Sequence, residues 1–136
     1  MAGTTFQWLE PHARSFLRII AGFMFSLHGF QKLFGLFGGM GGSGAHAVFP
    51  KLPWVAGVLE TFGGVLMILG LFTVPVAFIL SGEMAVAYFM MHMPKGFWPI
   101  RNGGELAALY SFIFLYFFTA GPGPWSFDRW FRKKSK

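Results

Sequence analysis

The chain has 136 residues, a length typical of one domain, and its eleven Lys and Arg outnumber five Asp and Glu for a net charge of +6. Hydrophobic residues make up 54% of the chain and charged residues only 12%, unlike an ordinary soluble domain. There is no cysteine, which excludes dithiol–disulfide exchange, thiolate metal sites and a cysteine nucleophile. The basic residues lie mainly at the ends of apolar runs, so the positive charge indicates membrane topology rather than binding to nucleic acid.

Four apolar runs of about 18–22 residues dominate the chain, each long enough to cross ~30 Å of hydrocarbon. A soluble core would leave too little polar surface to cover four such runs. The pattern therefore predicts an all-α integral membrane protein, a four-helix bundle in which residues 1–136 form a single domain with a short basic C-terminal tail. The expected helices cover residues 15–37, 54–72, 75–93 and 103–120.

The first expected helix carries a stripe of polar and small residues. At 100° per residue the stripe includes Arg18 and Lys32, with His28 at its edge. Gly22 and Gly29 lie on the same stripe and would let a neighbouring helix approach closely. The helix is therefore expected to bury this face against its neighbours.

Each of the three later helices carries one glutamate. Counting around the helix predicts three shared faces: Glu60 with Gly57, Gly64 and Met67; Glu83 with Ala87 and Met90; Glu105 with Phe112, Tyr116 and Thr119. His92 falls about half a turn away from Glu83, so a straight helix cannot direct both side chains to one point.

These charges are costly inside a bilayer. Three glutamates with Lys32 and His28 would together cost on the order of 10 kcal/mol unless they are paired, protonated or wetted. Lys32 with Glu60 or Glu105 is the first pairing to expect, and a neutral glutamic acid could donate a hydrogen bond. Such contacts serve either as structural links between helices or as parts of a pocket or pathway, and both interpretations stay open at this point.

The segments outside the helices indicate orientation. Six glycines between Gly35 and Gly44 predict a flexible external loop, with a lid as the alternative. The tail ends in an aromatic and basic stretch suited to an anionic surface. With four spans, seven Lys and Arg lie on the side of the two termini and four on the other, which places both termini in the cytoplasm.

Metal and haem sites are weakly indicated. His28 and His92 lie on opposed faces with no second pair, which disfavours axial haem ligation. No ligand spacing supports a metal at His28, Glu60 and Glu105. Aromatic residues around a polar pocket would suit a flat hydrophobic ring.

These residues also resemble a family. Arg18, Leu27-His28-Gly29 and Lys32-Leu33 are similar to the first-helix pattern of the DoxX family of small membrane proteins. The likeness continues over residues 15–130 with Gly57-x-x-Glu60-x-x-Gly63-Gly64, Leu69-Gly70-Leu71-x-Thr73, Gly104-Glu105 and Gly121-Pro122-Gly123-x-x-Ser126-x-Asp128. The resemblance implies a four-helix protein of a bacterial or archaeal inner membrane that is connected with redox processes. Relatives are named as a subunit of a thiosulfate:quinone oxidoreductase, and others are associated with complexes that handle oxidative and thiol stress.

The hypothesis that follows is a membrane redox subunit, such as a subunit of an oxidoreductase. It would have a quinone or quinol pocket among its helices. Glu60, Glu105 and Lys32 are the candidate catalytic residues, whereas His28, Arg18, Glu83 and Tyr116 are the candidate ligand-binding residues. Lys32 or His28 would donate to a quinone oxygen, and Glu60 or Glu105 would take or deliver the coupled proton. Electrons would come from a partner redox protein or bound cofactor.

Two other classes remain as alternatives. A non-catalytic membrane scaffold would use its small-residue faces and basic tail for a partner protein or for homo-oligomerisation. A small proton-linked transporter would use the charges near the midplane, and would need to oligomerise or to leave a water-filled cleft.

Overall fold

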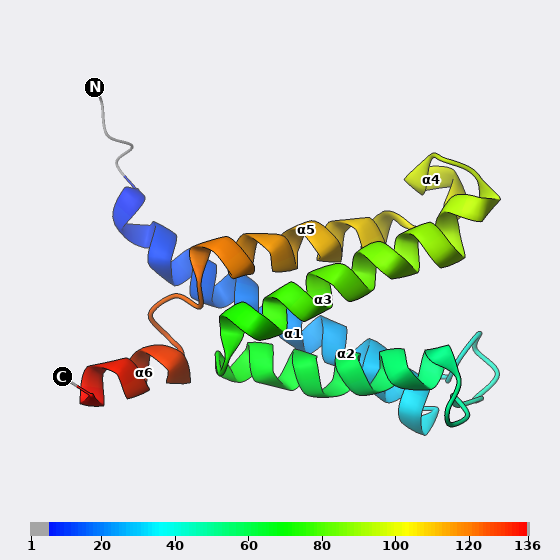
Figure 1. The fold of residues 1–136 in the computed structure, drawn as a ribbon, viewed down its shortest axis with the longest axis horizontal. Coiled ribbons are helices and arrows are strands. Elements are labelled where there is room, and N and C mark those ends of the chain that lie inside the picture. Colours follow the sequence, from blue (N-terminus) through cyan, green and yellow to red (C-terminus); the bar gives the residue numbers. More distant parts are fainter. Residues whose placement is uncertain (1–5, 136) are drawn as a thin grey trace.

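The computed structural model describes residues 6–135, and all regular elements in that range are helical apart from one bridge between Met40 and Ala45. Four long helices run along the molecule (Figure 1): α1 (Glu10–Phe34), α2 (Leu52–Leu69), α3 (Thr73–Ala87) and α5 (Glu105–Ala120). The shorter elements are the 3-10 turns Gln7–Leu9 and Met93–Lys95, the π turn Tyr88–His92, α4 (Pro99–Asn102) and α6 (Phe127–Lys134).

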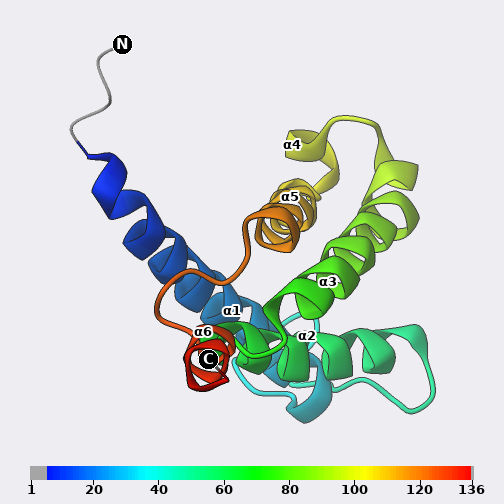
Figure 2. The ribbon, with the colours of Figure 1, turned by 60° about the vertical axis from the view of Figure 1, so that its left-hand side comes forward.

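The long helices associate in two pairs. α1 packs along α2, α3 packs along α5, and contacts between α2 and α3 join the pairs (Figure 2). The start of α1 and helix α6 lie at one end of the molecule, while α4 and the 35–51 loop lie at the other (Figure 1). We call these the terminal end and the loop end. Because four long helices run back and forth, the start of α1 and the end of α6 come to the same end.

The bounds of α1 differ from the expected 15–37. The helix begins at Glu10 because Pro11 is preorganised for a first turn and Glu10 places a negative charge at the helix N-terminus. It ends at Phe34 because Gly35 adopts a left-handed conformation with φ of +67°, and its N–H bonds to the carbonyl of Gln31. Gly70 ends α2 in the same way, with φ of +65°.

Two further departures lie in the second half of the chain. The expected helix 75–93 is helical throughout, but it is α-helical only to Ala87 and then passes into the π turn Tyr88–His92. The tail beyond Pro124 forms the helix α6, which the sequence reading did not predict. Ser126 begins α6, since its Oγ accepts a hydrogen bond from the backbone N–H of Arg129 at 3.3 Å.

Glycines bring α1 and α2 into close contact. A Cβ added to Gly29 would lie 2.4 Å from the backbone nitrogen of Thr61, and one added to Gly22 would lie 2.7 Å from the carbonyl oxygen of Gly64. Both glycines belong to the stripe expected to bury itself, so the predicted close approach is confirmed. This contact sets the position of α1 side chains relative to those of α2.

The outer surface is rich in large apolar side chains. Phe62, Phe78, Phe89 and Phe112 are each at least 60% exposed, and many Leu, Ile and Val residues are exposed beside them. The segments Leu52–Leu69 and Thr73–Lys95 are long and apolar enough to cross a membrane, and α5 is apolar but shorter. The buried core lies between the helix pairs and includes Phe25, Phe114 and Phe117.

Candidate functional site

A polar clamp closes the terminal end of the molecule. Arg18 is fully buried, and its Nε donates to the carbonyl of Pro122 at 2.9 Å. Its two Nη atoms donate to carbonyls at the end of α2, Met67 and Ile68, and to the carbonyl of Trp125. The last carbonyls of a helix have no hydrogen-bond donor within the helix. The Arg18 guanidinium supplies donors to these carbonyls of α2 and links them to the segment before α6.

Asp128 completes this clamp from α6. Its carboxylate accepts hydrogen bonds from the backbone N–H groups of Phe72 and Thr73, each at 2.8 Å, at the start of α3. Its own N–H donates to the carbonyl of Gly70 at 2.9 Å. Arg18 and Asp128 therefore fix the turn between α2 and α3 against the C-terminal segment.

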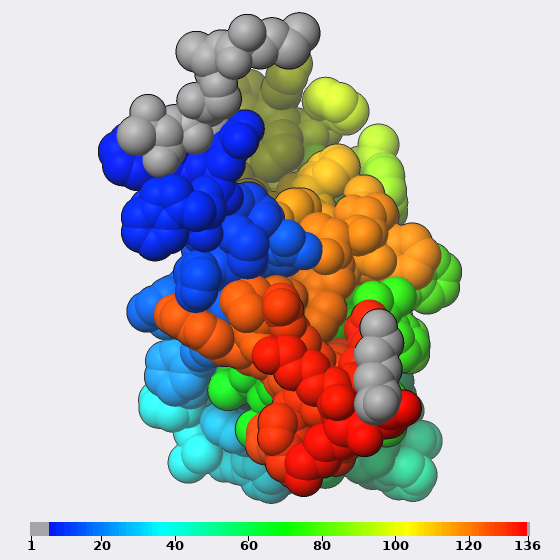
Figure 3. Space-filling view, turned by 90° about the vertical axis from the view of Figure 1, so that its left-hand side faces the viewer, coloured from blue at the N-terminus to red at the C-terminus, as the bar shows by residue number. Residues whose placement is uncertain are grey.

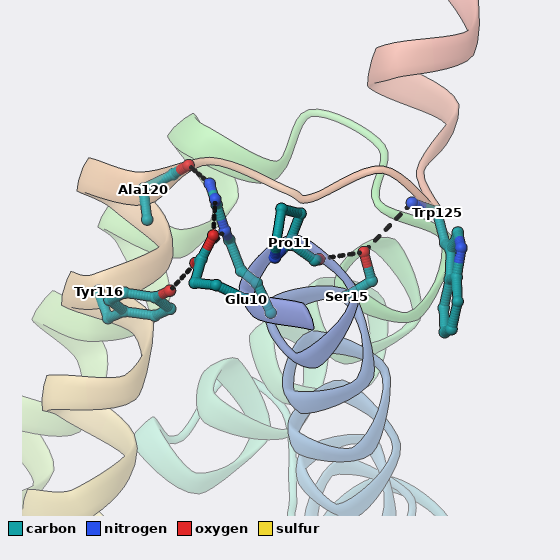
Figure 4. A network of polar contacts seen from close by, with 7 residues as sticks. Glu10, Pro11, Ser15, Tyr116, Ala120 and Trp125 are labelled. Atoms are coloured by element: carbon teal, nitrogen blue, oxygen red, sulfur yellow. Dashed lines mark hydrogen bonds and ion pairs between the residues drawn. The ribbon is translucent and has the colours of Figure 1, made fainter. Parts of the chain in front are cut away.

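A second network at the same end joins α1 to α5 (Figure 4). Arg14 pairs with Glu10 at 2.7 Å and donates to the carbonyl of Ala120, while the Tyr116 hydroxyl donates to Glu10 at 3.1 Å. Ser15 bridges the backbones of Pro11 and Trp125 beside this network.

The expected pairing of Lys32 is confirmed in the half of the molecule toward the loop end. Lys32 Nζ lies 2.5 Å from Oε1 of Glu60, and the Glu60 side chain is only 2% exposed. The two residues face each other because Gly29, one turn before Lys32, lets α1 approach Thr61 of α2. Lys32 alone is partly open, with 29% of its side chain exposed.

Two cavities meet at this ion pair. The first, of about 350 Å³, lies between α2 and α3 and is lined mainly by apolar side chains together with Lys32, Glu60 and Glu83. We call it the α2–α3 cavity. The second, of about 210 Å³, lies between α1 and α5 and includes His28 and Tyr110 in its wall. We call it the α1–α5 cavity. Lys32 and Glu60 line both cavities and so form part of the partition between them.

Several buried polar atoms around these cavities have no partner among the described residues. They are Oε2 of Glu60, both carboxyl oxygens of Glu83 and the hydroxyl of Tyr110. A buried polar group without a hydrogen bond is costly, and such groups call for an explanation such as a ligand, an ion or water. All three residues line one or both cavities. The cavities therefore present hydrogen-bonding atoms to whatever enters them.

The structure separates three predicted residues from this cluster. Glu105 is exposed at the first position of α5, and its predicted companions Phe112 and Tyr116 also lie on the exposed face of that helix. Tyr116 belongs to the Glu10 network and Arg18 to the clamp, both at the terminal end. Glu105, Phe112, Tyr116 and Thr119 all lie on the exposed side of α5, because α5 turns Ala107, Tyr110, Phe114 and Phe117 inward. The expected place of Glu105 in the Lys32 cluster is therefore wrong.

Two residues of the cavities were not singled out as site residues from the sequence. Tyr110 lines the α1–α5 cavity from the buried face of α5, and its ring lies 5.0 Å from that of Phe25. His92 reaches the same cavity from the π turn, with Nδ1 3.1 Å from the carbonyl oxygen of Asn102. Tyr110 has the same helical spacing as the buried Ala107, Phe114 and Phe117, but α5 carries apolar residues on every face, so this period alone could not select it.

The cluster offers proton-exchanging and hydrogen-bonding groups next to an apolar space. Within residues 6–135, no group of three His, Asp or Glu side chains converges in a way that could hold a metal ion. The ammonium of Lys32 is a donor, the carboxylate of Glu60 is an acceptor, and Glu83 can act as either according to its protonation. This set can bind a polar ring edge while the remaining wall contacts apolar atoms.

Comparisons with known proteins agree with the sequence pattern. The model of the DoxX family matches residues 13–93, which include Lys32, Glu60 and Glu83. An uncharacterized protein of Haemophilus influenzae is 52% identical over 129 residues, covering 92% of this chain and 95% of that protein. No solved structure matches the chain.

Proposed function

The chain belongs to the DoxX family, and we propose that it is an integral membrane subunit of a redox system that binds a quinone or quinol beside the Lys32–Glu60 pair. The four long helices would each cross the bilayer, with both termini in the cytoplasm. The exposed apolar surface and the two long apolar segments support the membrane assignment. The excess of basic residues on the side of the termini supports the orientation.

One observation carries the proposal: an ion pair with spare hydrogen-bonding atoms lies at the wall of an otherwise apolar cavity. The α2–α3 cavity has about 350 Å³ and is lined by Leu59, Ile79, Met84 and Met90 in addition to the charged residues. Small-molecule sites commonly combine a mostly apolar wall with a few polar groups that fix orientation. A volume of this order lies at the lower end of the range for such sites.

The residues present fit a quinone. Its two carbonyl oxygens accept hydrogen bonds and its ring is flat and apolar, so the site needs donors at the edge and aliphatic contacts at the faces. Lys32 Nζ supplies one donor, and a protonated Glu83 would supply another from the same cavity. The hydroxyl groups of a quinol would donate to the unpartnered carboxyl oxygens of Glu60 and Glu83, whereas a quinone oxygen would accept from a protonated carboxyl.

A bound quinone would supply two-electron, two-proton redox chemistry. In this proposal Lys32 orients the ligand through its ammonium, and Glu60 takes up or releases a proton at its free Oε2. The apolar wall excludes water from the ion pair, and His28 and Tyr110 form a polar side on the α1–α5 cavity. The chain has no cysteine for a thiolate-bound electron carrier, so a partner redox protein would supply or take the electrons.

The test is binding of a quinone to the purified full-length protein. We expect organic extraction of the protein from its native membrane to recover quinone in near-stoichiometric amount. A soluble short-chain benzoquinone should then bind to the emptied protein, raise its thermal unfolding temperature and be released by extraction. Tryptophan fluorescence can follow unfolding, since the chain has five Trp and no cysteine for a thiol dye.

A blocking variant locates the ligand. Ala56 lines the α2–α3 cavity and takes no part in the Lys32–Glu60 ion pair, so Ala56→Phe should fill the cavity and abolish quinone binding. Ala13→Phe, at an exposed position near the terminal end, is the matched control and should bind as the wild type does. Wild-type protein that neither contains quinone nor takes it up would contradict the proposal, and would favour the scaffold alternative.

A further inference from the structure

A third hollow lies at the terminal end, away from the ion pair and the two cavities around it. It has about 350 Å³ and is enclosed by the start of α1, the segment between α5 and α6, and α6 itself. Figure 3 shows these segments together on one face, with α1 in blue, the connecting segment in orange and α6 in red. Three arginines line it: Arg14, Arg129 and Arg132. We call it the arginine pocket.

The charge of the arginine pocket is only partly balanced by carboxylates, because Glu10 pairs with Arg14 alone. Among residues 6–135 the ion pairs are Glu10 with Arg14 and Lys32 with Glu60. Asp128, the acidic residue of α6, gives its two carboxyl oxygens to backbone N–H groups at the start of α3. Arg129 and Arg132 therefore bring two positive charges to the pocket without a carboxylate partner in that range.

The position of Arg14 is fixed by its existing contacts. Three of its five N–H donors are used by Glu10 and by the carbonyl of Ala120, which hold the guanidinium between α1 and α5. Two donors remain. Because a guanidinium is planar and presents its donors as a fork, it matches the oxygens of a phosphate group better than a lysine ammonium does.

The opposite face of α6 is apolar. Phe127, Trp130 and Phe131 are each between 44% and 49% exposed. A separate hollow of about 370 Å³ lies on this side of α6, between Trp130 and the end of α2 at Ile68 and Leu69. A short helix with aromatic residues on one face and basic residues on the other suits the interface of a membrane with anionic lipids. Phosphate groups are found at that depth.

We propose that the arginine pocket is a binding site for a phosphate group, and the aromatic face of α6 points to an anionic phospholipid as the molecule that carries it. Arg129 and Arg132 would donate to the phosphate oxygens from α6, and Arg14 would do so from α1. The bound phosphate would link the C-terminal helix to the first helix. This site is independent of the quinone proposal, because it shares no residue with the α2–α3 cavity.

The first experiment measures binding to the full-length protein in mild detergent by native mass spectrometry. The probes are a phosphatidylglycerol and a phosphatidylcholine of the same acyl chains, and inorganic phosphate is tested separately by thermal unfolding at constant ionic strength. We expect tighter binding of phosphatidylglycerol than of phosphatidylcholine. Stabilisation by millimolar inorganic phosphate without lipid preference would also support a phosphate site, but would assign the ion as its ligand.

Matched variants distinguish the pocket from a general basic surface. Arg129→Gln with Arg132→Gln should weaken binding on the order of tenfold for each arginine removed, the equivalent of one charge-assisted hydrogen bond each. Lys133→Gln with Lys134→Gln removes the same charge from the same helix outside the pocket lining and should change binding little. Arg129→Lys with Arg132→Lys keeps the charge but loses the fork, and should also weaken binding.

The outcomes are decisive in either direction. Equal loss of binding in the glutamine variants of both pairs would show that α6 acts only through its net charge, and would overturn the proposal. Absence of binding by both lipid and phosphate to the wild type would overturn it as well. An unchanged unfolding temperature of the arginine variants without ligand establishes that any loss of binding is not a loss of fold.

Discussion

Two basic residues on one face of α1, Arg18 and Lys32, meet opposite surroundings. Arg18 is fully buried, and four of its five donors are directed to backbone carbonyls at the terminal end. Lys32 is partly open and holds one oxygen of Glu60, while the other oxygen and the carboxyl of Glu83 have no partner in the described chain. Arg18 lines neither the α2–α3 cavity nor the α1–α5 cavity, whereas Lys32 borders both.

This difference separates structural from functional charge. A buried charge whose hydrogen bonds are all made stabilises one arrangement of helices and has little left to offer a ligand. A buried charge with spare donors or acceptors beside a cavity costs stability unless something else completes it. A charge in an apolar helix can therefore be structural or functional. The number of hydrogen bonds that the charged group makes within the protein distinguishes the two cases.

The largest effect is expected at the clamp. Arg18→Met would leave the carbonyls of Met67, Ile68, Pro122 and Trp125 without their donor. We expect a loss of about 3–5 kcal/mol in the free energy of unfolding, because several hydrogen bonds from a charged donor are lost together. Thermal unfolding followed by tryptophan fluorescence measures it.

Arg18→Lys is the control for this position, because a lysine keeps the charge but reaches fewer carbonyls. Its free energy of unfolding should lie between those of the wild type and of Arg18→Met. If the Met variant unfolded at the wild-type temperature and lost quinone binding instead, the structural assignment of Arg18 would be wrong.

The ion pair should behave differently. Lys32→Met leaves Glu60, which is 2% exposed, without its cation, and we expect a loss of about 3 kcal/mol in the free energy of unfolding. This value is at the low end for a buried ion pair because the Lys32 side chain is 29% exposed. Lys32→Met with Glu60→Met should recover most of that stability, since apolar residues of similar volume often replace a buried pair without cost. Thermal unfolding measures the recovery, and quinone titration measures the function.

The double variant is the sharpest test of the comparison. We expect it to be folded yet unable to bind quinone, because its cavity has lost the donor and the acceptor. Normal quinone binding by a stable double variant would show that the pair only fixes the register of α1 on α2.

The glycine contact between α1 and α2 comes next. A Cβ at position 29 would lie 2.4 Å from the backbone nitrogen of Thr61, so Gly29→Ala must push the helices apart, and we expect a loss of about 1–3 kcal/mol. Gly82→Ala is the control, since a Cβ there meets nothing within 4 Å and should be neutral or stabilising by up to about 1 kcal/mol. Thermal unfolding of both variants checks the prediction, and equal unfolding temperatures would contradict it.

Helical periodicity was enough to predict much of this architecture. The burial of Gly22 and Gly29 on α1 and of Glu60 with Gly57 and Gly64 on α2 follows from residue spacing and small size. The pairing of Lys32 with Glu60 followed from the cost of leaving either charge alone. These features depend on one or two neighbouring helices, which is why local patterns contain them.

Other features depend on contacts that spacing does not encode. α5 is apolar all round, so its inward face could not be chosen from its pattern, and Glu105 with Tyr116 was preferred over Tyr110 for its polarity alone. The role of Arg18 depends on carbonyls from residues 67–68, 122 and 125, which converge only after folding. The π turn that brings His92 to a cavity wall has no marker in the sequence that we recognise.

The smallest effect on stability is expected at Glu83, and it is the most informative about function. Neither carboxyl oxygen of Glu83 has a partner among the described residues, so Glu83→Gln removes no observed bond and should leave the unfolding temperature unchanged or raised. Glutamine keeps a donor and an acceptor but cannot exchange a proton, so quinone should still bind, with any dependence of its binding on pH reduced. Glu105→Gln, at an exposed position, is the matched control and should alter neither quantity. A marked drop in the unfolding temperature of Glu83→Gln would mean that Glu83 has a stabilising partner after all, and the contrast between satisfied and unsatisfied charge would then fail at the residue where it is most pronounced.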